Sequence, residues 1–189
     1  MGKQNETRKE TNIIKEMLEL IACVVVAFSI TWGVLTFVGE RTNVKGSSMY
    51  ATLEDGDDLW IDKLSYRLKD PERFDIVVFP HEEGNDSVYY IKRIIGLPGE
   101  RIRIEEDGTI YINNEPLEEE YGYETIEPYT IGRAKSNLIL GEDEYFVMGD
   151  NRNDSLDSRD ETVGNIKRED LVGKTKLRVG PLNKFGLLD

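Results

Sequence analysis

The hydrophobic positions of this chain fall into one long run near the start and many short runs after it. No charged residue interrupts the sequence from Leu20 to Val38. At 1.5 Å per residue, a helix of about nineteen residues spans roughly 28 Å, close to the thickness of the hydrocarbon core of a bilayer. A helix at the surface of a soluble domain normally carries a polar stripe, and this run has none. The pattern therefore predicts a transmembrane helix over residues 20–38.

A cleaved signal peptide is the alternative to a permanent anchor. Signal peptides have shorter apolar regions, followed by small residues in an A-x-A pattern. This run is long and ends in Thr36-Phe37-Val38-Gly39-Glu40, so we expect an uncleaved anchor. Positive residues favour the cytoplasmic side, and more of them precede the run than follow it: Lys3, Arg8, Lys9 and Lys15 against Arg41 and Lys45. The bias predicts a short cytoplasmic tail, residues 1–19, and an extracytoplasmic domain, residues 39–189.

Beyond the apolar run, short strand-like segments alternate with turn residues, which is typical of a mostly β domain. The clearest hairpin pairs Arg101–Glu105 with Thr109–Asn113 across an Asp107-Gly108 turn. The other strands that we expect are Leu59–Asp62, Ile76–Phe79, Val88–Ile95, Tyr145–Met148 and Leu171–Val179. The acidic stretch Glu115–Glu127 is interpreted as a solvated loop or insertion. About 150 residues after the anchor are enough for one sizeable core, so we expect a single compact β-rich domain.

Composition excludes several classes of function. The net charge is −13, whereas nucleic-acid-binding domains present basic surfaces, so we expect no nucleic-acid partner. The only cysteine, Cys23, lies inside the apolar run, which excludes a disulfide framework and a cysteine-ligated zinc site. An EF-hand match to Asp150–Asp157 fails, because Arg152 and Ser155 stand where that loop needs an oxygen ligand and a glycine. We expect neither a metal nor a cofactor.

The only histidine, His81, is the first candidate for a catalytic base. It follows Pro80 in a polar segment that predicts a loop. A lone histidine in a loop is more often a solvated surface residue than a catalyst. From the residues alone, a histidine-based triad stays open.

Three segments in this order resemble the type I signal peptidases, the bacterial enzymes that cut signal sequences from exported proteins. Val44–Leu53 reads VKGSSMYATL, Tyr90–Glu100 reads YIKRIIGLPGE, and Phe146–Arg159 reads FVMGDNRNDSLDSR. Gly56-Asp57 and Arg73–Phe79 also fit the family. The resemblance covers most of residues 44–181, and the short chain with one anchor is more similar to the Gram-positive form.

The resemblance implies a serine endopeptidase in which Ser48 is the nucleophile and Lys92 the general base. Ser155 matches the position that orients the lysine, and Asp157 and Arg159 match a supporting pair. A free lysine, with a pKa of about 10.4, is protonated at neutral pH and cannot act as a base. Burial can lower that pKa by several units, and the apolar neighbours of Lys92 suit this requirement.

The resemblance also implies how the substrate is bound. The N–H of Ser48 is the expected donor to the oxyanion, while Gly46 and Ala51 stand where some relatives carry a hydroxyl donor and where proline is usual. Signal peptides of exported preproteins are the implied substrates, with small residues at the first and third positions before the cleaved bond. We expect the walls of those pockets from Met49, Leu53, Tyr90 and Ile91, and we expect the anchor to contact membrane lipid.

Other functions explain less of the sequence. A non-catalytic, signal-peptidase-like membrane protein that assists surface-fibre assembly would have lost the serine or the lysine, and this chain has both. A self-cleaving Ser–Lys protease would carry a DNA-binding amino-terminal domain in place of the apolar run. A membrane-tethered binding module leaves the order of the motifs unexplained. The oligomeric state is left open.

Overall fold

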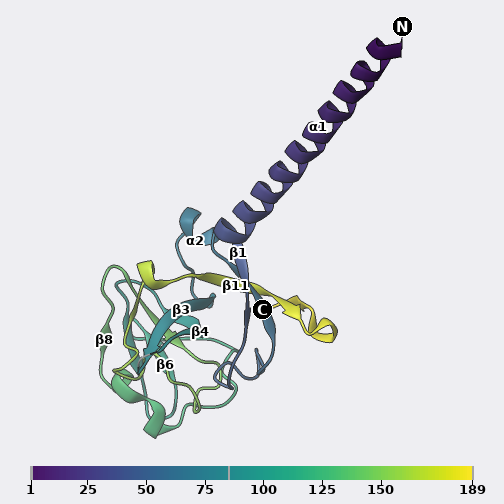
Figure 1. Cartoon of the computed structure of the whole chain (residues 1–189). Helices are drawn as coiled ribbons and strands as arrows, with labels where there is room; N and C mark the ends of the chain where they lie inside the picture. Colours follow the sequence, from purple (N-terminus) through teal and green to yellow (C-terminus); the bar gives the residue numbers. More distant parts are fainter. Residues whose placement is uncertain (1, 85, 189) are drawn as a thin grey trace. The chain divides into compact units, whose positions relative to one another are not determined.

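The computed structural model describes residues 2–84 and 86–188, without the side chains of residues 2–14 and 34–37 (Figure 1). The chain divides into two units, which separate after Gly39.

The first unit is a single helix, α1, from Gly2 to Phe37 (Figure 1). Its segment Lys15–Gly33, with a mean hydropathy of 1.7, is the one helical segment in the described part of the chain that is long and apolar enough to cross a membrane. The side chains from residue 15 to residue 32 are exposed, and an exposed apolar surface of this length suits a bilayer. The helix ends at Phe37, so Val38, the last residue of the predicted span, lies in the following turn.

The second unit is built from two β-sheets, as the prediction of a mostly β domain requires. In the larger sheet the strand order is β1-β2-β11-β3-β4-β9-β10, and β12 pairs with β11. Its strands are β1 (Gly39–Asn43), β2 (Asp58–Asp62), β3 (Ile76–Glu83), β4 (Asp86–Gly96), β9 (Glu144–Met148), β10 (Ile166–Lys167), β11 (Gly173–Gly180) and β12 (Gly186–Leu187). Short helical segments lie between strands of the second unit: α2 (Ser65–Leu68), η1 (Pro128–Thr130), η2 (Gly132–Lys135), η3 (Arg168–Asp170) and η4 (Leu182–Lys184).

The smaller sheet has the order β7-β6-β5-β8. Its strands are β5 (Arg101–Ile104), β6 (Ile110–Ile112), β7 (Glu115–Pro116) and β8 (Leu138–Ile139). One buried cluster joins the two sheets, because it contains Ile102 and Ile110 of the smaller sheet together with Ile95 and Phe146 of the larger one.

The central strands of the larger sheet are buried on both faces. Successive residues of a strand point to opposite faces, and in β3 Ile76 and Val78 belong to one buried cluster while Val77 and Phe79 belong to another. Burial on both faces explains why these strands read as continuous apolar runs rather than as alternating ones.

The structure confirms one local prediction and corrects two others. The predicted hairpin forms, and Ile102 of β5 pairs with Ile112 of β6. His81 does not lie in a loop: β3 continues past Phe79 to Glu83, and His81 pairs with Val88 of β4. The acidic stretch 115–127 is not a wholly solvated loop, because it begins with β7 and buries Ile126 in the core.

Candidate active site

Ser48 lies in the loop of residues 44–57 that connects β1 to β2. Backbone hydrogen bonds of 2.8 and 3.0 Å join Val44 to the Gly56-Asp57 pair and close this loop at its base. Met49, next to Ser48, is 2% exposed and packs into the core. The loop therefore presents a half-buried Ser48 from a fixed support.

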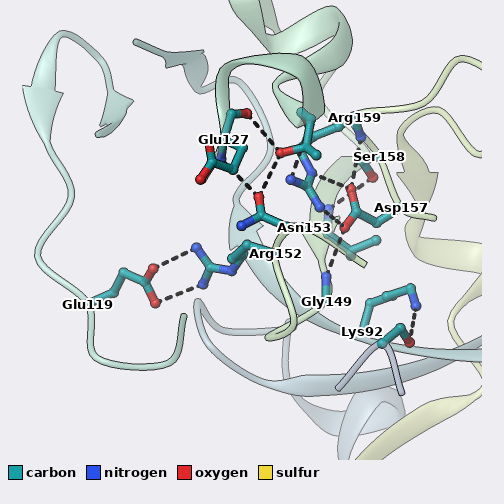
Figure 2. Close-up of polar contacts among 12 residues, drawn as sticks. Lys92, Glu119, Glu127, Gly149, Arg152, Asn153, Asp157, Ser158 and Arg159 are labelled. Carbon is teal, nitrogen blue, oxygen red and sulfur yellow. Dashed lines mark hydrogen bonds and ion pairs between the residues drawn. The ribbon is translucent and has the colours of Figure 1, made fainter. Parts of the chain in front are cut away.

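Lys92 lies on β4, where its backbone pairs with Val77 of β3. Its side chain is almost fully buried, and its Nζ lies 2.6 Å from Ser48 Oγ (Figure 2). Burial lowers the pKa of Lys92 to about 8; the carboxylate of Asp157 opposes this change, and the guanidinium of Arg159 adds to it. A substantial fraction of Lys92 is therefore neutral near pH 8, as a general base requires.

Asp157 and Arg159 form a buried ion pair in the third motif. Arg159 Nε and Nη2 donate to the two carboxylate oxygens of Asp157, each at 2.8 Å (Figure 2). One of these oxygens also accepts a hydrogen bond from the N–H of Gly149 at 3.0 Å. Burial alone would raise the pKa of Asp157, but the hydrogen bonds and the charge of Arg159 outweigh it and lower that pKa. The pair is thus ionised and fixes the fold of the segment that follows Gly149.

Gly149 allows the third motif, residues 146–159, to approach the loop of residues 44–57, here called the Ser48 loop. A Cβ atom at this position would lie 2.3 Å from both the carbonyl oxygen of Ser48 and Oγ of Ser155, so any side chain would push these groups apart. The Ser155 hydroxyl lies close enough to Asp157 to lower its pKa, but within the described residues it meets the geometry of a hydrogen bond with no group. The contact that we predict between Ser155 and Lys92 is not formed in this structure, and the orienting role stays a prediction.

Arg93 and Asp150 form a second buried ion pair, which the motifs alone did not predict. Arg93 Nε and Nη2 donate to the two oxygens of Asp150 at 2.9 and 2.8 Å, and neither side chain is more than 1% exposed. Thr52 of the Ser48 loop donates its hydroxyl to Asp150 at 2.6 Å. All three motif segments therefore meet at Asp150. The available signal was a charged residue inside the apolar run of β4, because a buried cation needs a partner.

A groove of about 580 Å³ runs beside Ser48 and Lys92. It is lined by residues 42–49 and 87–92, together with Glu83, Asp154 and Leu156. Met49, Tyr90 and Ile91 are among the lining residues, and their role in binding substrate stays a prediction. Leu53 does not line the groove, because it is fully buried in the core cluster that also contains Met49.

His81 lies outside this groove. Its ring packs against the ring of Tyr90, with 4.5 Å between centroids, and it does not line the cavity beside Ser48. Among the residues that the structure describes, no group of histidine, cysteine, aspartate and glutamate side chains is arranged to hold a metal ion.

Comparisons with known proteins identify relatives of this chain. The family model described as signal peptidase, peptidase S26, matches residues 17–180. A probable signal peptidase I-2 from Synechocystis sp. is 39% identical over 98% of this chain and 84% of its own length. Signal peptidase IB from Staphylococcus aureus is 34% identical over 90% of this chain and 93% of its own length.

A solved signal peptidase I from Enterococcus faecalis is 37% identical, covers 56% of this chain and 97% of its own, and has a TM-score of 0.44. Family membership is decided by the sequence matches, which extend along most of the chain. The family model spans residues 17–180 and the two relatives align with at least 90% of the chain, so this protein belongs to the signal peptidase family, peptidase S26.

Proposed function

We propose that this protein is a membrane-anchored type I signal peptidase that cleaves signal peptides with Ser48 as nucleophile and Lys92 as general base. The observation that carries the proposal is the 2.6 Å approach of Lys92 Nζ to Ser48 Oγ beside an open groove. A lysine with a pKa of about 8 can take a proton at physiological pH. Nothing favours the non-catalytic alternative.

The reaction begins when Ser48 Oγ attacks the carbonyl carbon of the scissile bond and Lys92 Nζ takes the hydroxyl proton. The tetrahedral intermediate then collapses and the C–N bond breaks. The Lys92 ammonium returns its proton to the departing amine, so the mature protein leaves with a free amino terminus. The signal peptide stays as an ester on Ser48.

The second half of the reaction frees the enzyme. Neutral Lys92 takes a proton from a water molecule, whose oxygen attacks the ester carbonyl. When the second tetrahedral intermediate collapses, Ser48 Oγ regains a proton from Lys92, and the signal peptide leaves as a carboxylic acid. Lys92 is neutral again and ready for the next substrate.

The negative oxygen of each intermediate needs hydrogen-bond donors that are already in place. We assign the N–H of Ser48 to this task, because the hydrogen bonds among the described residues leave it unused. The N–H of Gly46 is engaged, since it donates to Asp55 Oδ1 at 2.8 Å. A second donor is not assigned.

The groove suits an extended peptide, because such a peptide adds main-chain hydrogen bonds to the backbone that lines the groove. The side chains of Met49, Tyr90 and Ile91 line the same groove as Ser48. We therefore propose that the residues before the scissile bond that face these walls are small.

The anchor completes the proposal. Residues 1–19 lie on the cytoplasmic side, residues 20–38 span the membrane, and residues 39–189 form the extracytoplasmic catalytic domain. The excess of basic residues before the apolar run supports this orientation. Anchoring keeps the active site near the membrane surface where signal peptides emerge, which raises their effective concentration.

The test is cleavage of a model preprotein with an alanine-x-alanine site by the full chain in detergent. Wild type should release one product that begins directly after the site, and Ser48→Ala should release none while keeping the wild-type circular dichroism spectrum. Ser136→Ala, at an exposed serine outside the groove, is the matched control and should cleave normally. Wild-type turnover by Ser48→Ala, or an inactive wild type, would refute the proposal.

A further inference from the structure

The acidic segment of residues 119–127, here called the strap, binds the loop of residues 150–153, here called the motif loop. Arg152 Nη1 and Nη2 lie 2.7 and 2.9 Å from the two carboxylate oxygens of Glu119 (Figure 2). The Arg152 side chain is 2% exposed and that of Glu119 is 11% exposed. A bidentate pair this well shielded from water is among the strong polar contacts in proteins.

The strap also holds the residues on either side of Arg152. The N–H of Tyr123 donates to the carbonyl of Asp150 at 2.8 Å. Asn153 donates from Nδ2 to the carbonyl of Thr125 at 2.9 Å. Its Oδ1 accepts from the N–H of Glu127 at 2.9 Å (Figure 2). The strap thus binds the motif loop at Asp150, at Arg152 and at Asn153.

Asn151, the remaining residue of the motif loop, contacts the backbone of the Ser48 loop. Its N–H donates to the carbonyl of Ser48 at 3.1 Å, and its Nδ2 donates to the carbonyl of Ser47 at 3.2 Å. The Ser47 carbonyl and the Ser48 N–H belong to one planar peptide unit, in which the two groups point in opposite directions. The Ser47 oxygen also accepts from the N–H of Tyr50 at 3.0 Å. These two donors together hold the oxygen and so set the direction of the N–H on the other side of the peptide.

We infer that Glu119 and Arg152 are positioning residues that act through Asn151 on the peptide carrying the Ser48 N–H. The inference rests on the proposed function, because it needs that N–H to bind the oxyanion. The strap holds the motif loop in place, and the motif loop orients the donor. The acidic stretch thereby contributes to catalysis without touching the substrate.

The inference predicts a particular kinetic signature. A donor to the oxyanion acts on the transition state and not on the bound substrate, so disturbing its direction lowers kcat while KM changes little. Removing such a donor outright lowers kcat by about 10²–10³ in a well-studied protease. Tilting it should have a smaller effect. Lys92 does not take part in this chain of contacts, so its titration should stay where it is.

The experiment compares Glu119→Gln with Glu120→Gln in the full chain, using preprotein cleavage. Glu120 is the next glutamate in the same run and is exposed, so the control removes the same charge without breaking the pair. We expect kcat to fall about tenfold in Glu119→Gln, with KM within about threefold and an unchanged midpoint in the pH–rate profile. Glu120→Gln should match wild type.

A double-mutant cycle shows whether the two residues act together. The single variants are Glu119→Gln and Arg152→Met. The double variant Glu119→Gln/Arg152→Met should lose no more activity per folded molecule than the more affected of the two, since each substitution breaks the same ion pair. Additive losses would overturn the inference. So would equal kcat in Glu119→Gln and Glu120→Gln, a change confined to KM, or a shifted pH midpoint.

If Arg152→Met does not fold, the comparison of the two glutamine variants decides alone. Failure of the inference is separable from failure of the proposed function. In the first case wild type and Glu120→Gln still cleave the preprotein, and in the second case neither does.

Discussion

Lys92 and Arg93 are neighbours on β4, and both side chains are buried, but only one of them is paired with a carboxylate. Both side chains are almost fully buried, at 4% and 1% exposed. Arg93 is held by both oxygens of Asp150. Lys92 lies against the Ser48 hydroxyl, and no carboxylate in the described part of the chain forms an ion pair with it. One region neutralises its cation by pairing, and the other leaves the lysine to lose its proton.

The difference follows from the chemistry of the two side chains. A guanidinium keeps its charge in any protein environment and offers donors that match a carboxylate. An ammonium buried without such a partner lowers its pKa. The paired arginines at 93, 152 and 159 therefore hold the motif segments together, while the unpaired lysine is the base in the proposed mechanism. Within the same site, the paired arginines thus make the structure rigid, and Lys92 is available for proton transfer in the proposed mechanism.

The largest effect is expected from replacing Lys92. Lys92→Ala removes the base and should lower kcat by about a thousandfold or more. Lys92→Arg is the sharper variant, because it keeps a long cationic side chain that cannot lose its proton. Both variants should be equally inactive in preprotein cleavage while their circular dichroism spectra match wild type. Substantial activity in Lys92→Arg would show that a positive charge, and not a base, is what the site needs.

The paired region should respond in stability. Asp150→Asn removes the charge of the carboxylate that binds two nitrogens of Arg93, and breaking a buried ion pair in this way typically costs about 3–5 kcal/mol. Denaturant unfolding of the full chain in detergent measures the loss. Glu106→Gln is the control, because the Lys135–Glu106 pair is exposed at 68% and 74%, and exposed pairs contribute less than about 1 kcal/mol. Equal losses in the two variants would remove the distinction between the regions.

Much of the fold was predictable because buried strands keep their apolar runs and hairpin turns their Asp-Gly signature. The extension of β3 through His81 was not, because Pro80 and the polar residues beyond it are typical of loops. Beyond the core, the strand is held by pairing with β4, and such pairing tolerates polar side chains. A pattern along one segment does not contain that information.

The candidate site shows the same limit. Ser48 and Lys92 were predicted through a family resemblance, but their contact joins positions 44 residues apart in the sequence. The Arg93–Asp150 pair joins positions 57 residues apart. Glu119 looked like one of several solvated glutamates, because its partner Arg152 lies in a different motif. The sequence does not show that two charged residues far apart in the chain are buried, because the ion pair that allows their burial forms only in the fold.

The cost of leaving Lys92 unpaired should be measurable as a dependence of stability on pH. Its pKa falls from the ordinary 10.5 to about 8 on folding, so between these values the unfolded chain binds more protons than the folded one. The free energy of unfolding therefore rises with pH through this window, and below pH 8 the penalty is complete. Lys92→Met should be more stable than wild type by about 1–3 kcal/mol at pH 7.

That stability difference should shrink toward zero as the pH approaches 10.5. Denaturant unfolding of both proteins at pH 7 and pH 10 is the measurement. Lys69→Met, at an exposed lysine, should change stability little at either pH. A gain that is the same at both pH values would mean that Lys92→Met acts through packing and not through removal of a buried charge.

The smallest effect is expected at His81, the residue that would be the general base in a conventional triad. Its backbone pairs with Val88 and its ring packs on Tyr90, outside the groove. His81→Ala removes this ring contact and should cost less than about 1.5 kcal/mol of stability. It should leave kcat within about twofold, since no proton transfer passes through it. A hundredfold loss of kcat in a folded His81→Ala would mean that Lys92, although unpaired and in contact with Ser48, is not sufficient as the base.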